Sequence, residues 1–141
     1  MKYFTREASQ ELSNWKGSSR WDSLWARYGQ ELARTRDQLT PGWRELADTD
    51  FHDAEILAVE RLSDSQVTLR ISMGGERMCT LQFLGVREAR IPDSVVGDIW
   101  LYNEVHLTTH GSGDLQVLLR KSEMQIIAPD VGVFRNYDES A

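Results

Sequence analysis

The stretch Val67–Phe83, VTLRISMGGERMCTLQF, contains the two clearest strands of the chain. Apolar and polar side chains alternate along both halves, which is the pattern of strands with one buried face. Gly74-Gly75 joins the halves and is a typical signal for a two-residue hairpin turn. We therefore predict an antiparallel hairpin whose second strand continues to Val86. Cys79 is expected on its buried face, where burial disfavours a reactive thiolate.

Other segments with strand-like alternation lie before and after this hairpin. The predicted strands are Phe51–Leu62, Ile99–Leu107, Leu115–Arg120, Glu123–Ala128 and a short edge strand at Val131–Phe134. Ser94–Gly97 is expected to be a loop or a single helical turn. The alternation within Ile99–Leu107 divides its side chains between two faces. One face carries Trp100, Tyr102, Glu104 and His106, and the other carries Leu101, Val105 and Leu107.

The first third of the chain has a helical period instead. We predict a helix at Arg6–Lys16, a second helix that follows a cap at Ser19 and extends as far as Gln38, and a third at Pro41–Ala47 after a Thr40 cap. The second helix carries an apolar stripe of Trp21, Leu24, Trp25, Tyr28 and Leu32. Such a stripe is typical of a helix that packs on a sheet. The alternative is a protein-binding surface rimmed by Arg20, Arg27 and Arg34.

These elements predict an α+β fold. Two to three N-terminal helices pack on an antiparallel sheet of six or seven strands, arranged as a sandwich or a partly closed barrel. Residues 1–48 form the helical N-terminal layer and residues 49–141 form the antiparallel β part. With 141 residues, the chain is expected to be one structural domain overall.

Charge and composition exclude several classes of function. The net charge of −6 disfavours nucleic acid as a partner, because binding to phosphates usually needs a basic surplus. Residues 1–48 carry a net charge of +1 and residues 49–141 carry −7. No apolar run approaches the roughly 20 residues that a membrane span needs. The single cysteine, Cys79, excludes an intrachain disulfide and fits a cytoplasmic protein.

One polar cluster lies at the junction between the helical and β parts. It comprises Asp48, Thr49, Asp50, Phe51, His52, Asp53 and Glu55. The pattern favours a turn in which Asp50 and Asp53 accept main-chain hydrogen bonds while His52 packs locally. A functional site is the alternative, since carboxylates and histidine can bind cations or transfer protons. The candidate binding residues are His52, Asp53, Glu55, Glu104, Trp100 and Tyr102.

Familiar catalytic and metal-binding motifs are missing from the sequence. It has no nucleophile elbow, P-loop or dinucleotide-binding glycine motif, so we assign no catalytic residue and no cofactor. The spacing of the junction acids does not match a calcium loop. His106 and His110 could supply zinc ligands together with His52 only if the fold brought all three together. We therefore assign no metal site.

Several short motifs resemble a family of bacterial proteins, domain of unknown function 4085. The matching stretches are Met1–Glu7, Phe51–Ala54 followed by Ile56, Trp100–Glu104 and Leu115–Leu119. The resemblance spans most of the chain and implies a small cytoplasmic bacterial protein. It carries over no catalytic residue, because the family has none assigned.

Two functions of different class follow as hypotheses. The first is a non-enzymatic protein-interaction module, immunity-like by analogy, with a partner that is possibly basic because the chain is acidic. The second is a metal-dependent hydrolase or small-ligand-binding protein centred on His52 and Asp53, with Glu104 nearby. A structural homo-oligomer is a third alternative. The sequence identifies neither partner nor substrate.

Overall fold

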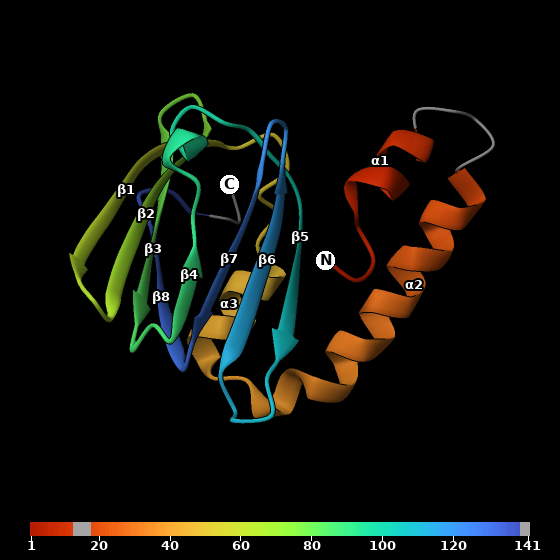
Figure 1. Ribbon diagram of the computed structural model, residues 1–141, viewed down its shortest axis with the longest axis horizontal. Coiled ribbons are helices and arrows are strands. Elements are labelled where there is room, and N and C mark those ends of the chain that lie inside the picture. Colours follow the sequence, from red (N-terminus) through yellow and green to blue (C-terminus); the bar gives the residue numbers. More distant parts are fainter. Residues whose placement is uncertain (13–17, 139–141) are drawn as a thin grey trace.

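The computed structural model describes residues 1–12 and 18–138, and Figure 1 shows its helices and strands. The α-helices are α1 (Arg6–Leu12), α2 (Ser18–Thr35) and α3 (Pro41–Asp48), and short 3-10 turns occupy Arg36–Gln38 and Asp93–Val95. The strands are β1 (Glu55–Ser63), β2 (Gln66–Gly74), β3 (Arg77–Leu84), β4 (Glu88–Arg90), β5 (Trp100–Leu107), β6 (Gly113–Leu119), β7 (Glu123–Ala128) and β8 (Asp130–Arg135).

The strands form two four-stranded antiparallel sheets, ordered β1-β2-β3-β8 and β4-β7-β6-β5. The predicted α+β class is confirmed, and so is the hairpin of β2 and β3. The described residues contain eight strands rather than six or seven. The additional strand is β4, whose three residues are too few to show an alternating pattern and which pairs with β7. Neither sheet closes on itself, so no barrel forms.

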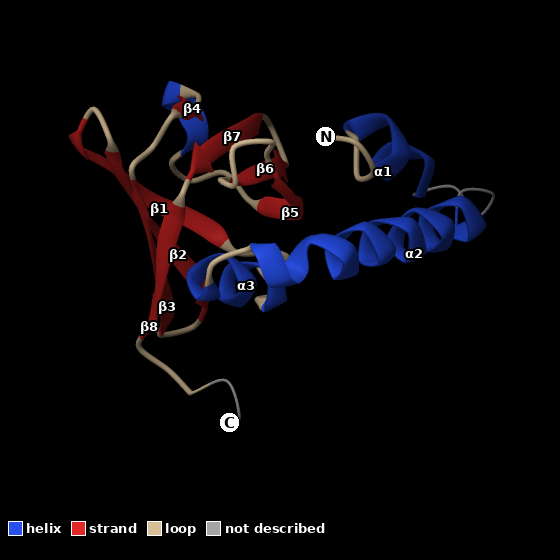
Figure 2. Cartoon of the chain, turned by 90° about the horizontal axis from the view of Figure 1, so that it is seen from below, coloured by secondary structure: helices blue, strands red, loops and turns tan. Residues whose placement is uncertain are grey.

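Both sheets contribute their apolar faces to one core, and α3 lies beside them (Figure 2). Trp43 and Leu46 of α3 are fully buried in this core. The Trp43 indole donates a hydrogen bond of 3.0 Å to the Ala128 carbonyl of β7. Two glycines permit the close packing of α3: a Cβ on Gly42 would lie 1.7 Å from the Val131 carbonyl oxygen, and one on Gly113 would lie 2.1 Å from the Trp43 ring.

The other two helices lie outside this core, next to β5. Figure 2 shows α2 extending away from the sheets with α1 beside it. A second apolar cluster joins them to β5: the partly buried Tyr102 of β5 packs against its buried members, which are Tyr3, Phe4, Ala8, Trp21 and Tyr28. The helices therefore occupy two different places: α3 fills the shared core, whereas α1 and α2 pack on the outside of β5.

The helix boundaries agree in part with the sequence. Thr40 caps α3 as predicted, because its side chain accepts a hydrogen bond from the Trp43 amide. Ser19 does not cap α2, since the helix already includes Ser18. The predicted end of the first helix at Lys16 lies outside the described residues. No helix in the described part of the chain is both long and apolar enough to cross a membrane.

Three predictions about strands were wrong. The second strand of the hairpin ends at Leu84 rather than Val86, since Gly85 follows it with a φ of 72°. The first strand begins at Glu55 rather than Phe51, because residues 51–54 form a turn in which the Ala54 amide binds the Phe51 carbonyl. Trp100 does not share a face with Tyr102. The pairing of β5 with β6 shifts between these two residues, and the extra residue of this bulge reverses the faces. Trp100 therefore points into the shared core.

The contact between Gly113 and Trp43 predicts the effect of two alanine substitutions. Gly113→Ala should lower the free energy of unfolding by about 1–3 kcal/mol, because the new methyl group collides with a buried ring. Gly29→Ala is the matched control: within the described residues nothing lies within 4 Å of its Cβ position, so helix propensity should raise stability by up to about 1 kcal/mol. Urea unfolding followed by tryptophan fluorescence measures both. Equal stability of Gly113→Ala and the parent would contradict the packing.

Candidate functional site

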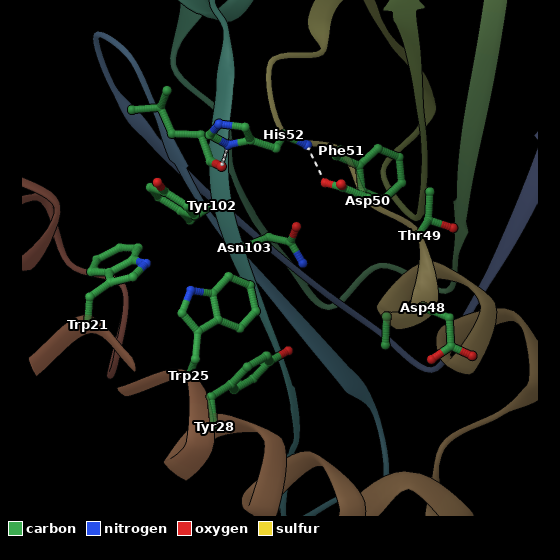
Figure 3. A pocket seen from close by; sticks show the side chains of 12 residues that line it. Trp21, Trp25, Tyr28, Asp48, Thr49, Asp50, Phe51, His52, Tyr102 and Asn103 are labelled. Atoms are coloured by element: carbon green, nitrogen blue, oxygen red, sulfur yellow. Dashed lines mark hydrogen bonds between the residues drawn. The ribbon is translucent and has the colours of Figure 1, made fainter. Parts of the chain in front are cut away.

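A pocket of about 520 Å³ opens beside β5 (Figure 3). Its volume lies within the range of ordinary ligand pockets. Three parts of the chain line it: the α2 helix, residues 47–52 at the end of α3, and residues 101–103 of β5. The pocket therefore depends on the packing of α2 and α3 on either side of the same strand.

The α2 wall of the pocket is aromatic. Trp21, Trp25 and Tyr28 are spaced four and three residues apart, which places them on one side of the helix. Trp21 and Tyr28 are buried, whereas Trp25 is 48% exposed. The Trp25 ring rests on the buried Phe4 ring, with 4.5 Å between centroids. Trp25 thus offers an aromatic face that is held in place from behind.

The opposite wall of the pocket carries negative charge. It contains Asp48, the last residue of α3, and Asp50. Arg36 donates hydrogen bonds of 2.6 Å to both carboxylate oxygens of Asp48, and these hold the pKa of Asp48 below its ordinary value. Within the described residues, no basic side chain forms a salt bridge with Asp50. The C-terminal end of α3 adds the partial negative charge of its last carbonyl groups.

His52 lies at the edge of the pocket and is held by two hydrogen bonds, one through its main-chain amide and one through its ring. Its amide donates to Oδ1 of Asp50 at 2.9 Å, and its ring Nδ1 donates to the Leu101 carbonyl at 2.6 Å. The ring lies 5.2 Å from the Tyr102 ring, and Nε2 is 3.6 Å from Oδ1 of Asp53. These contacts agree with the sequence-based interpretation for Asp50, which accepts a main-chain hydrogen bond, but not for His52, whose ring binds a carbonyl 49 residues away rather than packing locally. The Asp53 carboxylate, predicted to accept a main-chain hydrogen bond as well, instead faces the His52 ring.

The β5 wall presents the main chain of an edge strand. The Val105 amide donates to the Tyr28 hydroxyl at 2.7 Å, so this main-chain group points away from β6. Burial raises the pKa of Tyr28 to about 12, which keeps this hydroxyl neutral. Because main-chain groups alternate between the two sides of an antiparallel strand, the amide and carbonyl of Asn103 also point away from β6. They face the side on which the pocket lies.

On the outer face of β5, a buried carboxylate binds the N-terminal segment. Glu104 is fully buried, and its oxygens accept the main-chain amides of Lys2, Tyr3 and Phe4 at 2.8–2.9 Å. His106 Nε2 lies 2.8 Å from the same carboxylate, and its Nδ1 lies 3.0 Å from Glu31. These contacts tie the start of the chain and α2 to one strand.

The charges of this cluster shift the pKa values of its members. Burial by itself would raise the pKa of Glu104, but the hydrogen bonds from His106 and from three amides lower it below its ordinary value. Burial likewise disfavours the charged form of His106, yet the hydrogen bond to Glu104 and the nearby charge of Glu31 raise its pKa. The pKa of Glu31 is lowered, because Lys2 and His106 outweigh its desolvation. The folded protein therefore favours a carboxylate–imidazolium–carboxylate arrangement.

Two of the candidate binding residues, His52 and Tyr102, line the pocket. Asp53 and Glu55 are exposed, and Asp53, with a φ of 68°, lies 3.6 Å from the His52 ring. The remaining two are buried elsewhere: Trp100 lies in the shared core and Glu104 lies under the N-terminal segment. Because of the bulge in β5, Trp100 does not lie on the same face of the strand as Tyr102, as its predicted position required.

The three residues of the hydrolase hypothesis are not assembled as metal ligands. Glu104 is engaged by main-chain amides and His106, whereas His52 binds the Leu101 carbonyl. Among residues 1–12 and 18–138, no group of three or more His, Cys, Asp or Glu side chains is placed to hold a metal ion. The chemistry that the pocket does support is the binding of a group with positive charge and a flat or apolar surface.

Sequence patterns alone did not identify four residues of the pocket as a group: Trp21, Trp25, Asp48 and Asn103. The apolar stripe of α2 favours packing on the sheet, and only the alternative of a binding surface points to Trp25. No sequence pattern points to Asn103, because it belongs to the pocket through its position on a strand at the edge of a sheet. Asp48 belonged to the junction cluster, but its pairing with Arg36 depends on the fold.

Comparisons with known proteins place the chain in a family without assigning it a function. The chain belongs to the family described as "Protein of unknown function (DUF4085)", whose family model matches residues 1–128. This confirms the resemblance of the short motifs. No curated protein and no solved structure matches the chain.

The buried carboxylate yields a prediction about stability. Glu104→Ala should lower the free energy of unfolding by about 3–5 kcal/mol, since it leaves His106 and three amides without their acceptor. The amides of Lys2, Tyr3 and Phe4 should also exchange faster with solvent hydrogen. Glu123→Ala, at an exposed position of β7, is the control and should change stability by less than about 0.5 kcal/mol. Unchanged exchange at the three amides would show that Glu104 does not bind them.

The raised pKa of His106 predicts a pH dependence. Because the folded state favours the protonated form, His106 stabilises the protein fully below its ordinary pKa of 6.5, and this contribution is lost as pH rises through the folded-state pKa. Urea unfolding between pH 5.5 and 8.5 should show this loss in the parent but not in His106→Gln. The exposed His110 provides a matched control variant, His110→Gln, which should behave like the parent. Identical pH profiles for all three proteins would refute the prediction.

Proposed function

We propose that this protein is a protein-binding module that takes a basic segment of a partner protein into the pocket between α2 and β5. The single observation that carries the proposal is the half-exposed Trp25 ring, which faces a wall containing Asp48 and Asp50. Tryptophan dominates the binding energy of many interfaces, and Trp25 is a half-exposed tryptophan that lines a pocket.

The charge of the pocket supports a basic partner. Asp50 and the C-terminal end of α3 favour a cation, and the faces of aromatic rings attract cations as well. The surrounding β part adds a net charge of −7 over residues 49–141, which would steer a basic protein toward the site. An immunity-like role, in which the basic partner is a toxin, is one form of this function.

A randomised peptide library tests the proposal with the full chain. Selection should enrich basic peptides, and their binding, measured by fluorescence anisotropy, should weaken as salt is raised. Trp25→Ala should weaken the selected peptides by about 30-fold, equivalent to about 2 kcal/mol, because it removes the aromatic face. Asp50→Asn should weaken them less and reduce the dependence on salt.

Phe134→Ala is the matched control for these variants. Phe134 is 57% exposed on β8 and is not among the residues of the pocket, so its removal should leave peptide binding unchanged. Thermal unfolding of each variant shows whether it is folded. The proposal fails if no basic peptide is enriched, or if the selected peptides bind Trp25→Ala and the parent equally well.

A further inference from the structure

On the edge of β5 that faces away from β6, side chains bind the main chain at two points and leave main-chain groups available between them. At one end, the His52 ring donates a hydrogen bond to the Leu101 carbonyl. At the other end, the Tyr28 hydroxyl accepts a hydrogen bond from the Val105 amide. The register agrees with this arrangement: the Thr108 amide binds the Ser112 carbonyl, so beyond the bulge the main-chain groups of Tyr102, Glu104 and His106 point toward β6. Asn103 therefore has its amide and carbonyl directed outward, between two protected neighbours.

This opening fits the main chain of one residue in an extended segment. An added strand binds a sheet edge through main-chain hydrogen bonds, and a side-chain pocket next to the edge gives the interaction its specificity. The Asn103 side chain is already held, since its Oδ1 accepts the Trp100 indole at 3.0 Å. Figure 3 shows Asn103 in the middle of the pocket, between the Trp25 side and the acidic side.

The side walls of the pocket match a guanidinium better than an ammonium. A guanidinium is planar, so it can stack on the half-exposed Trp25 ring, and its five N–H donors can reach acceptors in several directions. On the acidic side the Asp50 carboxylate is such an acceptor. The chain itself provides an example next to the pocket, because the guanidinium of Arg36 binds Asp48 through two hydrogen bonds.

We propose that the pocket binds an arginine side chain of the partner protein, presented by an extended segment whose main chain pairs with Asn103 at the edge of β5. The proposal rests on the proposed function and names both the side chain and the geometry of its binding. The arginine lies between Trp25 and Asp50, and the pairing is limited to a short segment because His52 and Tyr28 close the edge on either side.

The probe for this inference is the acetylated and amidated pentapeptide Thr-Val-Arg-Val-Thr, titrated to millimolar concentration into the full, isotope-labelled chain. The β-branched residues favour an extended conformation. In nitrogen-15 NMR spectra, the Asn103 amide and the Trp25 indole signals should shift, with the Asn103 amide moving in the direction of a new hydrogen bond. Trp25→Ala should weaken binding at least tenfold, and Phe134→Ala should leave it unchanged.

Three altered peptides separate the parts of the interaction. Citrulline in place of arginine keeps the shape but removes the charge and should weaken binding at least tenfold. Lysine keeps the charge without the planar group and should weaken binding several-fold. Methylation of the arginine main-chain nitrogen removes a donor to the strand edge and should abolish the shift of the Asn103 amide.

Each outcome supports or overturns the arginine proposal. It is overturned if the pentapeptide causes no shifts at millimolar concentration, if citrulline binds as well as arginine, or if the shifted signals lie away from the pocket. Selected basic peptides that bind at Trp25 but tolerate citrulline and main-chain methylation would overturn this inference while leaving the proposed function in place. Failure of the library selection itself would instead contradict the proposed function.

Discussion

The buried carboxylate of Glu104 is the interaction on which the candidate site depends. It binds three consecutive amides of the N-terminal segment and so places Phe4 next to β5. Phe4 in turn supports the Trp25 ring from behind. A buried charge is unfavourable unless hydrogen bonds and an opposite charge compensate it, and here the amides and His106 supply both. The position of the exposed Trp25 ring thus depends, through Phe4, on the buried carboxylate of Glu104.

The edge of β5 imposes a second constraint. Unpaired main-chain groups on a sheet edge can pair with other chains, and proteins usually cover or protect them. Here protection comes from side chains on different elements: Tyr28 from α2 and His52 from the turn before β1. Between them, Asn103 remains accessible beside the pocket. The same arrangement that limits uncontrolled strand pairing therefore leaves one place for a short segment.

Much of the fold could be predicted from local patterns. The strands with clear alternation, such as β2 and β3, and the capped helix α3 follow from side chains within a few residues of one another. Short or irregular elements could not be predicted in this way. β4 has three residues, and the bulge near Leu101 is set by the pairing of β5 with β6, which changes the face of Trp100 without a local signal. Only His52 and Tyr102, among the candidate binding residues, line the pocket.

The sequence by itself determined the α+β class, the hairpin at the centre of one sheet, the acidic character of the β part and the resemblance to the family. These properties depend on composition and on periods of two or about four residues, which neighbouring positions record directly. Only the tertiary structure decided that Glu104 is buried under Lys2–Phe4, that Trp25 is exposed, and that Asn103 lies at an open edge. Each of these depends on contacts between segments far apart in the chain, and no local pattern specifies which distant segment will cover a given side chain.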